Sequence, residues 1–458
     1  MLKSKIALAV AAATTLAACN MTVDTVDDTG ALLAEVRVIH ASADAPAVNA
    51  YLSMIDNSAD VANLDYADSS NYISVPATAY PVNVTGLSAG GETGAVISVD
   101  SLPLEGNTRY DIIAVGSVAN GTLEPVVLAD SGNLTDANNV RVRVAHLAAG
   151  APEVDVYVTA PDADLATSTP LNNNPLPFKQ ALDAVEVPAG EYQIRITAAG
   201  NVDAVVYNSG AVALPAGADL LVGALDNVRS GDSPVQLVAF DQGNEIDLFD
   251  TSAGADLRVV HNSVDTPAVD VVANGNYSAP LVSGLGFTED AGYLTVPGAT
   301  YNVQVGAAGF DSAEGAAINA DLTLATGAEY SVVAVGRLAN IEPLVLEDDQ
   351  RTVATHAKLR VVHGATNAAG VDVYLTAADD QDISDDAPVL SDVPFKADSG
   401  YLPVAGGNYT LTVTPAGSKT AAIGPVQISL SNNNVYTAIA RDDGDSAVAL
   451  KLLDGFVQ

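Results

Sequence analysis

The sequence predicts an all-β protein made of tandem antiparallel β-sandwich modules, of which the immunoglobulin-like fold is one form. Apolar and polar residues alternate with period two, as where Tyr192, Ile194 and Ile196 are interleaved with Glu191 and Arg195. Turn residues recur between such runs, and no segment shows a helical period. Each stretch of roughly 100 residues holds about seven short strands, which is typical of a sandwich.

A motif that occurs four times divides the chain into repeats. The motif is Arg-Val-x-His, and it stands at Arg37 to His40, Arg143 to His146, Arg258 to His261 and Arg360 to His363. The ninth residue after each histidine opens another strand-like run, and these residues are Asn49, Asp155, Asp270 and Asp372. Self-similarity at a fixed period indicates modules of one fold. We therefore predict modules at 36–130, 140–241, 256–348 and 358–458, joined by short polar linkers like beads on a string.

Each repeat continues with a turn that leads into a tyrosine strand. The examples are Val75-Pro76 before Tyr80, Val187-Pro188 before Tyr192, Val296-Pro297 before Tyr301, and Val404-Ala405 before Tyr409. With the opening motif, Asp-x-Pro and Asp-Val-Tyr, this pattern resembles the bacterial family named domain of unknown function 4397, over residues 36 to 455. The second copy departs at Gly150 and at Leu221-Val222-Gly223, and the fourth lacks the proline after Asn367. The resemblance implies an exported or cell-surface β-sandwich protein with no assigned activity.

The N-terminus has the layout of a secretory signal. Residues 1–18 combine Lys3 and Lys5 with a short apolar run that is too short to span a bilayer. Leu16 to Cys19 resembles the lipobox of bacterial lipoproteins, in which the cysteine receives a diacylglyceryl group and acyl chains such as palmitate. Cys19 is the single cysteine of the chain. An ordinary signal peptide with an incidental cysteine is the alternative.

These features predict where the mature protein works. A lipid on Cys19 would anchor the chain, with residues 19–35 as a tether. Asn20 favours the outer membrane over the inner one, with the modules facing the periplasm or the cell surface.

Composition narrows the classes of partner. The chain has 18 basic and 56 acidic residues, a net charge of −38, which repels nucleic acid. It contains no tryptophan, so an aromatic platform for sugars is disfavoured. With one cysteine, each module must be held together by its own core rather than by disulfides.

The repeated polar residues have two interpretations. In an alternating strand His40 shares a face with Val38, whereas Arg37 shares the opposite face with Ile39. Each histidine and its downstream aspartate could form a metal or acid–base site, or they could be buried folding determinants. We favour the structural role, since a group that every module needs must recur. The residues assigned this role are Arg37, His40, Arg143, His146, Asp155, Arg258, His261, Asp270, Arg360, His363 and Asp372.

No motif of a nucleophile, a zinc site or a phosphate loop occurs, so we predict no catalytic residue and no cofactor. Two acidic loops offer weak calcium binding as an alternative, and they contain Asp379, Asp380, Asp382, Asp385 and Asp386, and Asp442, Asp443 and Asp445. The sequence thus predicts a non-enzymatic, lipid-anchored envelope protein for adhesion, binding of a protein or polysaccharide partner, or structural spacing. The alternatives are a carbohydrate-active or hydrolytic lipoprotein with a site between modules, and a calcium-stiffened stalk.

Overall fold

The computed structural model describes residues 30, 32–52 and 58–454, so the predicted signal peptide and Cys19 lie outside the described residues. The described chain is all-β, as predicted, apart from three short 3₁₀ helices. No helix among these residues is both long and apolar enough to cross a membrane.

The strands fall into four modules of eight. Module 1 contains β1 (Leu33–Ala41), β2 (Val48–Tyr51), β3 (Val61–Leu64), β4 (Ile73–Pro76), β5 (Ala79–Ser88), β6 (Gly91–Pro103), β7 (Arg109–Val115) and β8 (Glu124–Asp130). Module 2 contains β9 (Asn139–His146), β10 (Val154–Thr159), η1 (Leu165–Thr167), β11 (Val185–Pro188), β12 (Gly190–Ala198), β13 (Val205–Leu214), β14 (Asp219–Asp226), β15 (Val235–Asp241) and β16 (Asn244–Leu248).

The second half of the chain repeats this order. Module 3 contains β17 (Ala255–His261), β18 (Val269–Ala273), β19 (Val282–Leu285), β20 (Asp290–Val296), β21 (Ala299–Ala307), η2 (Ala313–Gly315), β22 (Ala316–Leu324), β23 (Glu329–Val335), η3 (Leu338–Asn340) and β24 (Glu342–Asp348). Module 4 contains β25 (Ala357–His363), β26 (Gly370–Ala377), β27 (Leu390–Pro394), β28 (Asp398–Val404), β29 (Gly407–Pro415), β30 (Ile423–Leu430), β31 (Val435–Asp443) and β32 (Ala447–Asp454).

Each module is a sandwich of two sheets. One sheet, here called the inner sheet, contains the Arg-Val-x-His strand and has the order β4-β1-β7-β8 in module 1; the other, the outer sheet, has the order β3-β2-β5-β6. Modules 3 and 4 repeat these orders. Module 2 differs, because its inner sheet gains β16 at the edge beside β15 and its outer sheet has three strands.

Two details of the sandwich differ from the sequence-based prediction. The first strand of each module runs parallel to a later strand of its inner sheet, in the pairs β1–β7, β9–β14, β17–β23 and β25–β31, so the inner sheets are mixed rather than purely antiparallel. Period-two alternation shows which face a residue occupies but carries no information on the direction of the neighbouring strand. In addition, the segment 242–255, predicted as a linker, contains β16.

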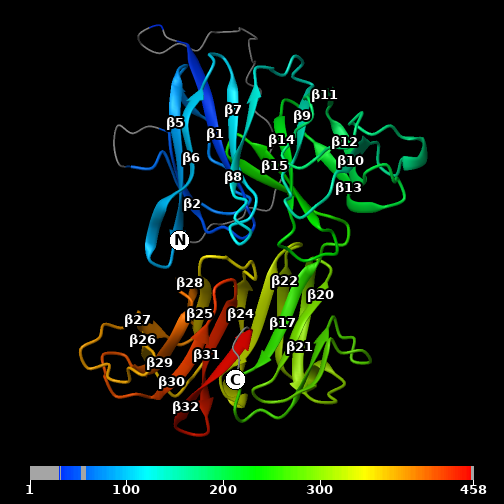
Figure 1. The fold of residues 1–458 in the computed structure, drawn as a ribbon. Coiled ribbons are helices and arrows are strands. Elements are labelled where there is room, and N and C mark those ends of the chain that lie inside the picture. The colour runs from blue at the N-terminus through cyan, green and yellow to red at the C-terminus, as the bar shows by residue number, and fades with distance from the viewer. Residues whose placement is uncertain (1–29, 31, 53–57, 455–458) are drawn as a thin grey trace.

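The modules pack back to back in pairs through their inner sheets. Modules 1 and 2 share an apolar cluster that includes Ile39, Ile113, Leu225 and Phe240. Modules 3 and 4 share a second cluster, which includes Val333 and Ile439. Figure 1 shows the two pairs one above the other. The extended string of beads that the linkers predicted is therefore wrong.

The linker between modules 3 and 4 connects the two pairs. The guanidinium of Arg351 donates to the carbonyls of Ala43 (3.3 Å) and Ala45 (2.9 Å) and pairs with Asp65 at 2.5 Å. The amide of Ala354 donates to the carbonyl of Asp44 at 2.8 Å. These bonds join the lower pair to module 1 through backbone groups as well as charge.

Candidate functional site

The repeated histidine lies buried at the end of the first strand of each inner sheet. In module 1, Nε2 of His40 lies 2.9 Å from the carbonyl of Pro46, and Nδ1 accepts from the amide of Ser42 at 3.3 Å. Because a carbonyl can only accept, Nε2 carries the proton and the ring is neutral. Burial lowers the pKa of His40 and so favours this neutral form. The ring ties the first strand to the turn that follows it.

Modules 2 and 3 repeat this bond, and module 4 does not. The Nε2 atoms of His146 and His261 lie 2.9 and 3.0 Å from the carbonyls of Pro152 and Pro267. The fourth copy lacks that proline, and the buried Nε2 of His363 has no hydrogen-bond partner of good geometry. Burial lowers the pKa of His363, and the nearby backbone of Ala368 offsets part of this effect. The missing proline in the sequence marks this difference.

An aromatic ring meets the edge of every repeated histidine. The centroids are 6.1 to 6.2 Å apart, and the partners are Tyr66, Phe178, Phe287 and Phe395. Sequence reasoning missed this contact. The signal was available, because the aromatic residue follows its histidine at one distance in modules 1 and 3 and at a longer one in modules 2 and 4. In this spacing module 1 matches module 3, and module 2 matches module 4.

The repeated aspartate closes two turns of the outer sheet. The two carboxylate oxygens of Asp270 accept from the amides of Gly284 (2.6 Å) and Gly309 (2.7 Å). Asp372 accepts in the same way from the amides of Asp392 and Gly417 at 2.8 Å. In module 2, Asp155 accepts from the side-chain amide of Asn172 and from the amide of Gly200, and Asn49 in module 1 accepts from the amide of Asn63. None of these aspartates lies against its histidine, so the structure does not bring the two together as a site.

The repeated arginines face away from the sandwich core, toward the neighbouring module. Arg258 of module 3 and Arg360 of module 4 both approach Asp348, at 3.7 and 2.5 Å, and the Asp348 side chain is fully buried. Arg258 also pairs with Asp454 at the end of module 4. The guanidinium carbons of Arg258 and Arg360 lie 4.6 and 4.7 Å from the ring centroids of Tyr293 and Tyr401. The second interface therefore contains a buried Arg–Asp–Arg group.

The first interface arranges its charges differently. Arg37 pairs with Asp111 of its own module at 2.8 Å. Arg143 is half-buried, and its Nη1 has no partner. Near the rim, four residues form an alternating network with distances of 2.7 to 3.2 Å, and they are Arg109, Asp130, Arg141 and Asp219.

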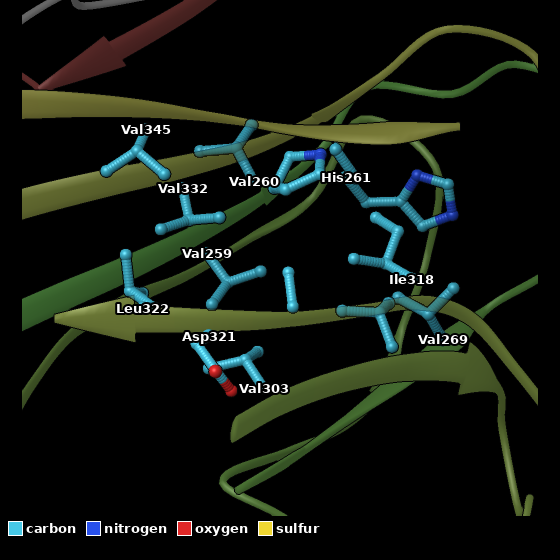
Figure 2. Close-up of a pocket in the computed structure, with 14 residues that line it drawn as sticks. Val259, Val260, His261, Val269, Val303, Ile318, Asp321, Leu322, Val332 and Val345 are labelled. Atoms are coloured by element: carbon cyan, nitrogen blue, oxygen red, sulfur yellow. The ribbon is translucent and has the colours of Figure 1, made fainter. Parts of the chain in front are cut away.

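A small apolar cavity lies inside module 3 between the two sheets. Its volume is about 50 Å³, larger than the ~10–15 Å³ that one water needs. Figure 2 shows Val259 and Val332 of the inner sheet and Val303 and Ile318 of the outer sheet around it. Val345 of β24 lines it too and is 43% exposed, so the cavity lies at an open edge of the sandwich. Such a lining favours an aliphatic group over water.

Several carboxylates of the two acidic loops in module 4 accept hydrogen bonds from groups of the protein itself. Oδ1 of Asp380 and Oδ1 of Asp382 each accept from the amide two residues further on, and Asp442 accepts from Thr366 and Asn367. Among the residues that the structure describes, no group of three or more His, Cys, Asp or Glu side chains is placed to hold a metal ion.

A family model matches residues 34–157, 255–374 and 376–457. The chain belongs to the family described as "Domain of unknown function (DUF4397)". The first two matched segments each cover one whole module and the first two strands of the next, and the third covers the rest of module 4. The predicted resemblance is thus confirmed, and this DUF4397 protein has its repeats arranged as two pairs.

No curated protein matches the chain. Among solved structures, the TIE protein of Bacillus anthracis is 10% identical and aligns over 87% of this chain and 69% of its own, with a TM-score of 0.15. A putative adhesin from Bacteroides ovatus is 11% identical, with 48% and 96% covered and a TM-score of 0.15. Alpha-glucan-recognising family 41 carbohydrate-binding modules from streptococcal virulence factors are 13% identical, with 41% and 93% covered and a TM-score of 0.14. At such TM-scores these similarities support no conclusion about this chain.

Proposed function

We propose that this DUF4397 protein is a non-catalytic binding scaffold of the cell envelope, held at the outer membrane by a lipid on Cys19. Its four modules form a rigid two-tiered block rather than a flexible stalk. The outer sheets and the open edges of the sandwiches are then the surfaces that meet a protein or polysaccharide partner.

The observation that carries this proposal is how the repeated polar residues are used. The histidines bond to turns, the aspartates cap turns, and Arg258 and Arg360 join modules across an interface. These residues build and dock the modules, which favours a scaffold over a repeated catalytic site. The inner sheets are covered by each other, so what each module presents to solvent is its outer sheet. That face is polar: in module 3, Asn302 bonds Asn319 and Asp321 across β21 and β22.

Surface display is tested on intact cells. If the lipid anchor holds the block on the outer surface of the cell, protease treatment followed by mass spectrometry should yield peptides from all four modules. A Cys19→Ser variant should lose incorporation of labelled fatty acid and appear in the soluble fraction. If the modules stay protected while known surface proteins are cut, display at the surface is wrong, and the block faces the periplasm.

The shape of the block is tested by small-angle X-ray scattering on the purified protein. A compact chain of this length has a radius of gyration of about 22 Å, whereas a string of beads roughly 100 Å long exceeds about 30 Å. We expect a value nearer the first. A value above the second would exclude the rigid block.

A further inference from the structure

The inner sheet of module 2 has an additional strand at its edge, which shows how an extended segment can bind there. Its strand β16 adds antiparallel to β15, with Ile246 opposite Ala239 and Leu248 opposite Leu237. Leu248 packs against the core of module 2. The following residues reach the other sheet, since the amide of Thr251 donates to the carbonyl of Asn208 at 2.8 Å. One extended segment thus closes the gap between β15 and β13.

Module 3 has the same edge without such a segment. Ala224 and Ala334 are equivalent, because each pairs with the histidine of its module across the parallel strands. Counted from these alanines, Leu237 corresponds to Pro343 and Ala239 to Val345. Ala239 is 2% exposed beneath β16, whereas Val345 is 43% exposed. The cavity of about 50 Å³ lies directly behind Val345 and Pro343, where module 2 has Leu248.

The equivalent edge of module 1 is exposed too, but the cavity of that module does not reach it. Val127, which corresponds to Val345, is 36% exposed. The module 1 cavity is about 40 Å³, and its lining includes Thr355 from the linker between modules 3 and 4 but no residue of β8. In module 3, by contrast, Pro343 and Val345 of the edge strand line the cavity. The open edge of module 3 is therefore the better receptor.

We propose that the β24 edge of module 3 accepts an extended, basic polypeptide strand, one of whose apolar side chains fills the cavity. The strand would pair along residues 342–346 by main-chain hydrogen bonds, the mode known as β-augmentation, and Pro343, which has no N–H, would contribute only its carbonyl. The carbonyl of Glu347 is excluded, because it accepts from Arg360. A partner module on the inner sheet does not block such pairing, since module 2 holds β16 and module 1 at the same time.

The negative charge around the β24 edge indicates which side chains the bound strand should carry. Asp321 on β22 is exposed and lines the cavity, Glu347 is exposed on β24, and the chain carries a net charge of −38. Glu342 at the start of β24 already pairs with Lys396 of module 4 at 3.1 Å. Lysine or arginine at the outward positions is therefore favoured over the acidic residues of β16. The alternation of side chains along a strand determines the inward positions: apolar residues at every second position of the bound strand point into the gap between the two sheets.

The probe is a labelled peptide based on the segment of module 2. Its sequence is Asn-Lys-Ile-Lys-Leu-Phe-Lys-Thr, which keeps the apolar residues of 244–251 and replaces the acidic ones by lysine. The control peptide has serine in place of isoleucine and leucine at the same charge. Fluorescence anisotropy with the full chain should give saturable binding of one peptide per chain, and the control peptide should not bind.

Two variants locate the site. Val345→Gln should weaken binding at least about tenfold, because a polar side chain then borders the cavity. Ile246→Gln is the matched control: Ile246 is 41% exposed on β16, so the substitution changes the surface equally and should leave binding unaltered. Circular dichroism checks that both variants fold. Absence of saturable binding, equal binding of the serine peptide, or unchanged binding by Val345→Gln would each overturn the proposal.

This inference rests on the proposed function, because it gives the scaffold a partner chemistry. The two can fail separately. The peptide experiment uses purified protein and does not depend on the lipid, whereas the protease and fatty-acid experiments do not depend on the β24 edge.

Discussion

The two module–module interfaces use the same strands and faces but different forces. Between modules 1 and 2 the centre is apolar, with Phe240 fully buried, and the carboxylate of Asp130 lies near the rim at 17% exposure. Between modules 3 and 4 the equivalent aspartate, Asp348, is fully buried between two arginines.

A difference at one position, that of the residue opposite the aspartate on the neighbouring strand, accounts for much of this contrast. The residue paired with Asp130 is Arg109, whereas the residue paired with Asp348 is Glu329. In the first pair an arginine therefore holds the aspartate at the rim. In the second the carboxylate has no arginine opposite it and lies between Arg258 of its own module and Arg360 of module 4, so this interface adds a buried ion group to its apolar cluster.

The largest expected effect breaks the ionic interface. Asp348→Ala should destabilise the module 3–4 pair by about 3–5 kcal/mol, because it leaves the buried guanidinium of Arg360 without a carboxylate, whereas Arg258 keeps Asp454. Chemical denaturation and hydrogen exchange of β24 and β25 measure this loss. Asp130→Ala is the matched control in the first pair, and its effect should be about 1 kcal/mol because Asp219 still pairs with both arginines. Equal effects would contradict the contrast.

The apolar interface should respond to loss of volume. Phe240→Ala should cost about 3–5 kcal/mol, since the ring is fully buried in the shared cluster of modules 1 and 2. Hydrogen exchange should increase in β7 and β14 and stay unchanged in β23 and β31. If all four strands exchange faster, the two pairs unfold as one unit and the separation of the interfaces is wrong.

The repeated histidines of modules 3 and 4 should contribute unequally to stability. His261→Ala should cost about 1–3 kcal/mol more than His363→Ala, because only His261 bonds the carbonyl of its turn. Thermal melting of the two variants, each compared with the wild type, measures the difference. An equal or larger loss for His363→Ala would contradict this role of the hydrogen bond, because the two histidines have the same ring contact, with Phe287 and Phe395 at 6.1 Å.

The smallest effect depends on pH. Burial, with Asp349, Asp256 and Asp348 nearby, raises the pKa of Glu329 from 4.5 to about 7. The folded pKa lies above the unfolded one, so this group's contribution to stability is complete below pH 4.5 and is lost as pH rises through about 7. Glu329→Gln should therefore stabilise the protein at pH 8 by roughly 1 kcal/mol, given partial solvent screening, and have no effect at pH 4. Urea denaturation at both values tests the sign, with Arg109→Gln as the control that should not stabilise.

The strand pattern and the repeat were predictable because both are local. Alternation placed Arg37 and His40 on opposite faces, and the structure has His40 in the sandwich core and Arg37 on the face toward module 2. The sequence also has runs such as Ile112 to Val115 that are apolar at consecutive positions, which favours burial of both faces. That signal could have predicted docked modules instead of a string.

The candidate binding edge could not be predicted in the same way. Val127, Ala239 and Val345 are all apolar residues of a closing strand, and nothing in their local sequence separates them. Their exposure depends on whether a segment from elsewhere lies beside them, as β16 does beside Ala239. The polar composition of 242–255 is typical of a linker, and only its pairing with β15 makes it part of module 2.

By itself the sequence determined the all-β fold, the four related modules and the DUF4397 membership, because these depend on period-two patterning and on residues that recur. The tertiary structure decided which sheet faces meet, where Asp348 finds its charges, and which sandwich edge stays open. The physical reason is that a strand offers two faces and an edge whatever its sequence, and only the neighbouring chain determines which of them are covered.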